Sequence, residues 1–103
     1  MRLTLDIDEP SCFHLLMSYY NLWYITKKRP EIRRSASGKG FHIKVHNMSL
    51  SEEKINEIRE LLGDDETRLK IDRIKVLEPK QVLFTKKKGV IASEWTSELE
   101  RVL

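Results

Sequence analysis

Apolar and polar residues alternate at two places in the chain, which is the pattern of a strand with one buried face. Residues 3–8 read Leu-Thr-Leu-Asp-Ile-Asp, which predicts one apolar and one acidic face, and Pro10 ends this strand. Residues 41–46 read Phe-His-Ile-Lys-Val-His. This run predicts a strand with its apolar residues on one side and the lysine and both histidines on the other.

Helical spacing fills two longer segments. Residues 12–28 follow Ser11, a capping residue, and precede Pro30, which stops a helix. The positions of this helix that we expect to face the core are Phe13, Leu16, Met17, Tyr20 and Trp23 or Tyr24. A Ser-Leu-Ser-Glu capping box at 49–52 predicts a second helix that ends at Gly63. Its expected core positions are Ile55, Ile58, Leu61 and Leu62.

The remaining segments complete the predicted order. They are a strand at 32–37, a glycine turn at 37–40, a short helix within 64–77, a strand at 81–85, a turn at 86–89, a strand at 90–92 and a helical tail at 93–103. The first five elements follow the order β-α-β-β-α of the ferredoxin-like or RRM-type split βαβ unit. We therefore predict a single α+β domain over residues 1–103, with helices on one face of the sheet and a C-terminal strand–helix extension.

Composition narrows the class of protein. The 103 residues carry 19 Lys and Arg against 16 Asp and Glu, and the net charge of +3 is compatible with a polyanionic partner. Cys12 is the only cysteine, so an intrachain disulfide is excluded and a cytoplasmic location is favoured. Neither a signal peptide nor a membrane-spanning run is expected. One Gln and three Asn beside abundant Lys, Arg, Glu and Ile are typical of a thermophile.

Asp6 and Asp8 are the first candidate site. Two carboxylates two residues apart project from the same face of a strand, and they repel each other unless water or a cation screens them. Hard cations such as Mg²⁺ or Mn²⁺ prefer such oxygen ligands. The alternative interpretation is the solvated polar face of an edge strand.

The second candidate is the segment Ser-Ala-Ser-Gly-Lys-Gly-Phe-His at residues 35–42. A glycine turn exposes backbone N–H groups that can hold a phosphate, and Ser37 and Lys39 add further donors. His42 stands at the start of the following strand. The spacing excludes a Walker P-loop, and an ordinary polar hairpin is the alternative interpretation.

An acidic strand, a helix and a Ser-Gly-x-Gly-x-His hairpin together resemble the archaeo-eukaryotic primase superfamily. The resemblance implies an RRM-like palm in which Asp6 and Asp8 bind divalent metal. It also implies that Ser37, Lys39 and His42 contact the phosphates of an incoming nucleotide.

A third acid completes the metal site of that superfamily. We assign it to Asp72, with Asp64 and Asp65 as alternatives. The basic residues expected to add to a nucleic-acid-binding surface are Arg33, Arg34 and Lys44.

Three functions remain open on this evidence. The first is a minimal primase-like nucleotidyltransferase of DNA replication, with a nucleoside triphosphate and nucleic acid, DNA above all, as partners. The second is a non-catalytic nucleic-acid-binding module. The third is a structural or dimerisation domain. A second protein subunit, or a second copy of this chain in a homodimer, is a further alternative as a partner.

Overall fold

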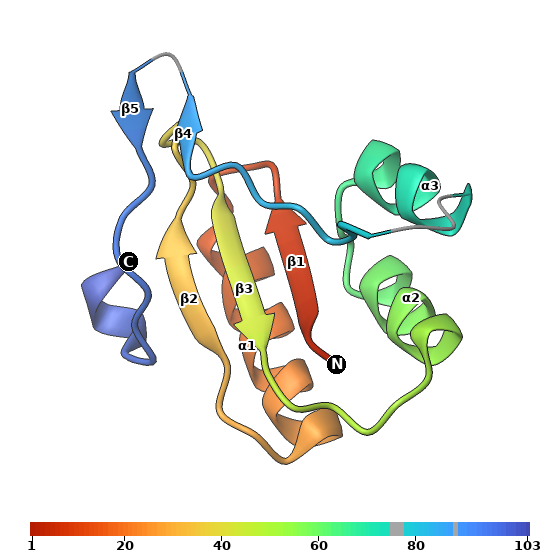
Figure 1. The fold of residues 1–103 in the computed structure, drawn as a ribbon. Coiled ribbons are helices and arrows are strands. Elements are labelled where there is room, and N and C mark those ends of the chain that lie inside the picture. The colour runs from red at the N-terminus through yellow and green to blue at the C-terminus, as the bar shows by residue number, and fades with distance from the viewer. Residues whose placement is uncertain (75–77, 88) are drawn as a thin grey trace.

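A computed structural model describes residues 1–74, 78–87 and 89–103 of the chain. The elements in chain order are β1 (Leu3–Ile7), α1 (Cys12–Thr26), β2 (Glu31–Arg34), β3 (Phe41–Val45), α2 (Glu52–Leu61), α3 (Glu66–Ile74), β4 (Lys86–Lys87), β5 (Val90–Ile91) and the 3₁₀ turn η1 (Leu99–Arg101). The first three strands form an antiparallel sheet in the order β1-β3-β2 (Figure 1). The predicted α+β class is confirmed.

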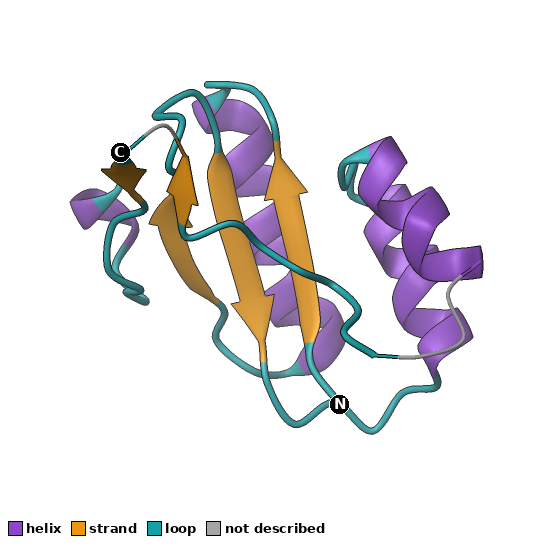
Figure 2. Ribbon diagram, turned by 45° about the horizontal axis from the view of Figure 1, so that its top comes forward, coloured by secondary structure: helices purple, strands orange, loops and turns teal. Residues whose placement is uncertain are grey.

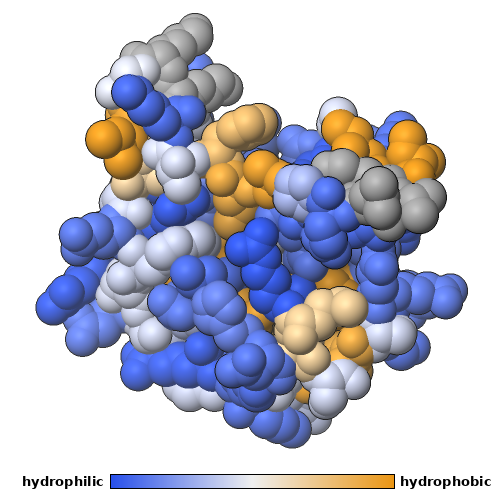
Figure 3. All heavy atoms as spheres, viewed as in Figure 1, coloured by the Kyte–Doolittle hydropathy of each residue, from blue (hydrophilic) through white to orange (hydrophobic). Residues whose placement is uncertain are grey.

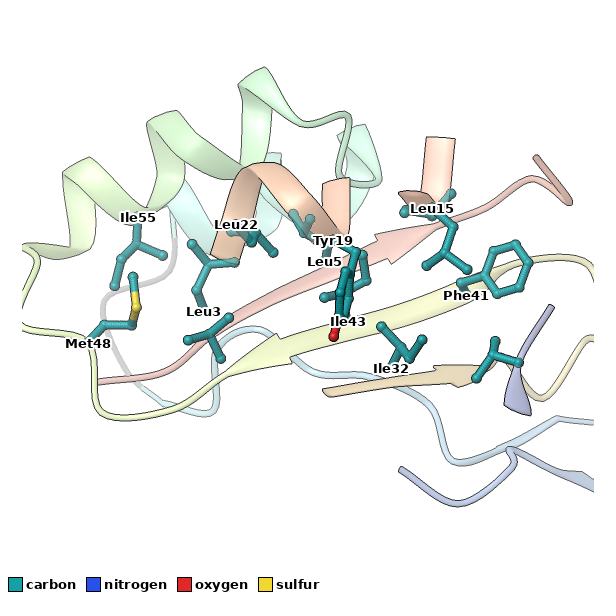
Figure 4. Close-up of a cluster of buried hydrophobic side chains, with 13 residues drawn as sticks. Leu3, Leu5, Leu15, Tyr19, Leu22, Ile32, Phe41, Ile43, Met48 and Ile55 are labelled. Atoms are coloured by element: carbon teal, nitrogen blue, oxygen red, sulfur yellow. The ribbon is translucent and has the colours of Figure 1, made fainter. Parts of the chain in front are cut away.

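The core lies between this sheet and α1, which runs behind the strands in Figure 1. β1 and β3 pair in a register that runs from Leu3 opposite Val45 to Ile7 opposite Phe41. The alternation predicted for both strands is confirmed, because their apolar residues share the buried face. Figure 4 shows this cluster, which Leu15, Tyr19 and Leu22 of α1 complete. The apolar pattern of the two strands therefore determines which face of the sheet α1 covers.

The core-facing side predicted for α1 is wrong. The buried residues of this helix are Leu15, Ser18, Tyr19 and Leu22. The expected core positions Phe13 and Tyr24 are instead 73% and 75% exposed. The prediction failed because α1 is apolar on both sides, so the spacing of its apolar residues does not identify the buried side.

The helices α2 and α3 pack together beside the edge strand β1 (Figure 2). Ser51, and not Ser49, caps α2, because its hydroxyl accepts the N–H of Lys54. Ile55 is buried as expected, whereas Leu61 is 77% exposed. Gly63 ends the helix with φ +79°, as predicted. The helix predicted within 64–77 is confirmed as α3, although residues 75–77 lie outside the described ranges.

Side chains occupy the outer edge of β1, where a fourth strand of a ferredoxin-like sheet would pair. The N–H of Thr4 donates to Gln81 Oε1 at 2.6 Å, and the Gln81 amide donates to the carbonyl of Arg2 at 2.7 Å. The N–H of Asp6 donates to Asp64 Oδ1 at 2.9 Å. These bonds satisfy the edge without a strand. Within the described residues no fourth strand lies beside β1, and the strand predicted at 81–85 is a loop.

The C-terminal part forms a two-stranded hairpin and an extended tail. β4 and β5 pair antiparallel, so the strand predicted at 90–92 is present, while residues 86–87 belong to a strand and not to the turn. Thr96 bridges to Ile32 at the edge of β2. The helix predicted over 93–103 is wrong except for η1, because the bridge holds the start of the tail extended. No helix of the described residues has the length and apolar content needed to cross a membrane.

Candidate functional site

The two sequence motifs meet at one end of the sheet. Asp6 on β1 and His42 on β3 are register partners on the face opposite α1. Asp6 Oδ1 lies 3.7 Å from His42 Nε2. Arg33 Nε donates to His42 Nδ1 at 3.0 Å, so the neutral imidazole carries its proton on Nε2, the nitrogen that faces the carboxylate. Residues 36 positions apart in sequence thus form one polar cluster.

Burial shifts the pKa of both partners. It raises the pKa of Asp6 to about 6, an effect that Arg68 opposes and that the negative charges of Asp64, Asp65 and Asp8 reinforce. Burial also lowers the pKa of His42 to about 4, helped by the positive charges of Arg33 and Arg68. At neutral pH the pair is therefore a carboxylate beside a neutral imidazole.

The 35–40 turn packs against the end of β1. Its backbone is closed by bonds from the Ser35 N–H to the Gly40 carbonyl and from the Gly38 N–H to the Ser35 carbonyl, both 3.0 Å. A Cβ on Gly40 would lie 2.0 Å from the carbonyl oxygen of Ile7 and 3.2 Å from Cα of Asp8. Glycine at this position therefore lets the turn reach the backbone that carries Asp8. Close packing explains this residue of the motif without any ligand.

The donors predicted to bind phosphate lie on the outside of this turn. Ser37 and Lys39 are exposed, and the N–H of Lys39 donates to Ser37 Oγ at 3.3 Å. Ser35 Oγ lies 2.9 Å from Ser37 Oγ. His42, by contrast, is 3% exposed and lies on the sheet below the turn. An anion bound at the turn would contact Ser37 and Lys39 directly, whereas the buried His42 faces the Asp6 carboxylate. We call the end of the sheet that carries Asp6, His42 and the 35–40 turn the Asp6–His42 corner.

A buried ion network lies next to the site and was not predicted. Asp64 accepts bonds from Arg59 Nε at 2.6 Å and from Arg68 Nη1 at 2.6 Å, besides the N–H of Asp6. Arg68 reaches further to Thr4 Oγ1 and to the carbonyl of Val82. The i, i+4 spacing of Asp64 and Arg68 is the one sequence signal for this network. Its members join α2, α3 and the edge of β1.

Asp72, the predicted third acid, belongs to the same network. Its Oδ2 lies 3.0 Å from Arg59 Nη1 and accepts the N–H of Gln81 at 2.9 Å, and the residue is 4% exposed. The charge of this carboxylate is therefore already balanced by an arginine, and its Oδ2 atom is engaged. The alternative Asp64 is equally committed, and Asp65 caps α3 by accepting the N–H of Arg68.

The acids fit a metal site only in part. Asp6 and Asp8 form no ion pair with an arginine or lysine within the described residues, and they keep carboxylate oxygens accessible at the end of β1. The structure does not bring Asp72 together with them as a third ligand. No group of three or more His, Cys, Asp or Glu side chains that could hold a metal occurs in residues 1–74, 78–87 and 89–103.

The basic residues predicted for nucleic acid are divided by the C-terminal tail. Arg33 and Lys44 lie against the ring of Trp95, with Arg33 Cζ 4.4 Å and Lys44 Nζ 4.1 Å from its centroid. Arg33 is only 6% exposed, whereas Arg34 is exposed and lies over the ring of Phe41. Hydrophilic residues gather over β2 and β3 on this side of the molecule (Figure 3). Trp95 therefore covers Arg33 and leaves Arg34 open.

A cavity of about 250 Å³ opens beside Asp6. Its lining combines Asp6, Asp65, Arg68 and Asp72 with apolar side chains that include Ile71 and Phe84. Comparisons with family models, curated proteins and solved structures found no match to this chain. A functional assignment therefore depends on the residues of the Asp6–His42 corner.

Proposed function

We propose that this chain is a primase-like, RRM-type palm domain that binds the phosphates of a nucleoside triphosphate in DNA replication. The observation that carries the proposal is the meeting of the two motifs: Asp6 and His42 face each other across adjacent strands at 3.7 Å. The fit of Gly40 against Ile7 places the turn at the same end of β1.

The turn would bind phosphate through exposed donors. Lys39 supplies a cation on a short glycine-flanked loop, and Ser37 supplies a hydroxyl two residues before it. Both can approach an anion without desolvating a core residue, because both are exposed. The Nε2 proton of His42 faces the Asp6 carboxylate, so His42 would position that acid beside the bound phosphates and would contact them only after a local rearrangement.

Two carboxylates of this chain would bind a divalent metal. Asp6 and Asp8 would share a Mg²⁺ or Mn²⁺ ion with the phosphates, and such an ion would offset the charge of the nucleotide. Asp72 does not fit as a ligand while Arg59 holds it. Binding is the function that the corner supports best, and nucleotidyl transfer would require a third acid from elsewhere.

Affinity for a fluorescent nucleoside triphosphate tests the proposal. Lys39→Ala removes the exposed cation of the turn, and Lys86→Ala removes an exposed cation from the other hairpin as the matched control. We expect Lys39→Ala to weaken binding by tenfold or more, because a charge-assisted bond contributes about 1.5–3 kcal/mol. Equal affinities of the two variants would contradict the proposal.

One observation favours the second candidate, a non-catalytic nucleic-acid-binding module. Arg33, Lys44 and Trp95 form a cation–aromatic cluster on the sheet, of the kind that stacks bases and contacts phosphates. Under this alternative, Lys44→Ala lowers affinity for single-stranded DNA while Asp6→Asn leaves it unchanged. The primase-like proposal expects Asp6→Asn to abolish the effect of Mg²⁺ on triphosphate binding.

A further inference from the structure

The helix α1 carries a second apolar face that nothing in the described chain covers. Phe13, Met17, Tyr20 and Tyr24 are spaced by four, three and four residues, which places them along one line of the helix. Their exposed fractions are 73%, 49%, 55% and 75%. We call these four residues the aromatic stripe. It lies opposite the side of α1 that is buried in the core.

The stripe is larger than a scatter of surface residues. Taking about 150–250 Å² for a whole aromatic side chain, the exposed fractions of the stripe, Trp23 and Leu61 correspond to roughly 700 Å² per chain. A monomer rarely exposes a contiguous apolar patch above a few hundred Å². Two such patches against each other would bury roughly 1,400 Å², which is within the range of stable protein interfaces.

The charges around α1 decide which partner fits. Between Cys12 and Thr26 the helix contains no Asp, Glu, Lys or Arg. A nucleic acid or an anionic membrane needs cations along the contact, and the stripe offers them only beyond its C-terminal end. That end carries Lys27, whose Nζ lies 4.4 Å above the Tyr24 ring. The other end is preceded by the exposed Glu9, whose Oε1 lies 2.6 Å from His14 Nδ1. Opposite charges at the two ends make the surface complementary to itself in antiparallel orientation.

We propose that the stripe is the interface of a two-fold symmetric homodimer in which the two α1 helices pack antiparallel. A two-fold axis midway along the stripe sets Phe13 of one chain against Tyr24 of the other, and Met17 against Tyr20. The four-three-four spacing is that of a helix–helix seam. Lys27 of each chain then meets Glu9 of its partner.

A groove beside the stripe could receive a side chain of the second copy. Met17, Asn21 and Leu61 are among the residues that line it, between α1 and the end of α2. Asn21 Nδ2 donates to the carbonyl of Met17 in its own helix at 2.7 Å, which holds this side chain along α1. Tyr20 of the second copy is placed to enter this groove. The interface lies on the side of α1 away from the sheet, so it leaves the Asp6–His42 corner open and is independent of the proposed function (Figure 1).

Sedimentation equilibrium of the full chain tests the dimer. Met17→Glu/Tyr20→Glu puts four carboxylates into the proposed interface, and Ile74→Glu changes an apolar side chain that is 81% exposed on α3 as the control. We expect wild type and the control to sediment as dimers and the double variant as a monomer with an unchanged circular dichroism spectrum. A monomeric wild type at high concentration, or a double variant that stays dimeric, would overturn the proposal.

A charge exchange tests the antiparallel arrangement even if the double variant misfolds. Lys27→Glu places like charges together at both ends of the interface and should weaken the dimer several-fold. Adding Glu9→Lys recreates opposite charges and should restore the association. If Glu9→Lys fails to restore association, or weakens it further, the antiparallel pairing is wrong.

Discussion

Two pairs of aspartates lie within one small region and differ in their partners. Asp64 and Asp72 are buried, Arg59 of α2 pairs with both, and Arg68 of α3 pairs with Asp64. Asp6 and Asp8 lie at the end of β1, and within the described chain neither is paired with an arginine or lysine. The first pair joins two helices to the sheet. The second pair keeps oxygens available at the corner where the turn arrives.

The difference shows that the partners of an aspartate, and not its place in a sequence motif alone, indicate its role. Asp72 follows the hairpin at residues 35–42 in sequence, as the third acid of the proposed palm would, but its contacts with Arg59 and Gln81 are those of a structural ion pair. Asp6 belongs to the acidic motif on β1, and its pKa is raised to about 6 because burial leaves its charge poorly compensated. Poor compensation, and not acidity itself, is what a functional carboxylate displays.

The largest effect is expected at Asp64. Asp64→Asn removes the carboxylate shared by Arg59 and Arg68, and breaking a buried pair costs about 3–5 kcal/mol. Urea denaturation followed by circular dichroism measures the loss. Asp65→Asn, at the neighbouring residue, keeps an oxygen that can cap α3 by accepting the Arg68 N–H, so it should cost no more than about 0.5 kcal/mol. Similar losses for the two variants would show that the network does not hold the helices to β1.

The next effect is expected at Gly40. A methyl group there would collide with the backbone of Ile7, and inserting a group into a packed site costs about 1–3 kcal/mol. In Gly89→Ala, in the other hairpin, the added Cβ has no atom within 4 Å. The one cost of that substitution is the backbone strain of a non-glycine residue at a φ of +82°. Thermal denaturation should therefore give Gly40→Ala a lower Tm than Gly89→Ala. The reverse order would mean that the turn does not pack on β1.

A smaller effect concerns pH and has opposite signs for the two partners of the corner. Native Asp6, with its pKa raised from 3.8 to about 6, binds more protons than the unfolded chain, so its contribution to stability falls as pH rises through that window. Native His42, with its pKa lowered from 6.5 to about 4, binds fewer, so its contribution rises with pH. In wild type the two slopes oppose each other.

Single substitutions should separate these slopes. Asp6→Asn leaves only the contribution of His42, so stability relative to wild type should increase from pH 4 to pH 6. We expect an increase of about 1–2 kcal/mol, because solvent screening of the partly exposed carboxylate reduces the roughly 1.4 kcal/mol expected for each pKa unit. His42→Gln should show the opposite trend over pH 4 to 6.5. Free energies of unfolding across this range measure both. Parallel profiles for wild type and both variants would contradict the pKa values that the corner implies.

The smallest effect is expected at Asp8. Asp8 is exposed, so Asp8→Asn should change the free energy of unfolding by no more than about 0.5 kcal/mol. The same urea titration used for Asp64→Asn measures it. A loss as large as that of the Asp64 variant would mean that both pairs of acids are structural.

Sequence patterns predicted the parts of the fold that depend on local alternation. The strands at residues 3–7 and 41–45 and the capping of α1 by Ser11 followed from period and cap chemistry. The buried side of α1 did not, because the helix has two apolar faces. The side-chain bonds of Gln81 along β1 could not be predicted either, since they join residues 77 or more positions apart. Asp72 departed from its expected role for a different reason, because Arg59 and Gln81, both near it in sequence, contact its carboxylate.

Amide chemical shifts of the ¹⁵N-labelled protein, titrated with a nucleoside triphosphate and Mg²⁺, test the central claim most directly. We expect the largest changes at residues 6–8 and 37–42, the loss of these changes in Lys39→Ala, and only small shifts at residues 59, 64 and 72. Changes centred on the Arg59–Asp64–Asp72 network, or the absence of any localised change, would contradict the claim that the Asp6–His42 corner is the functional site.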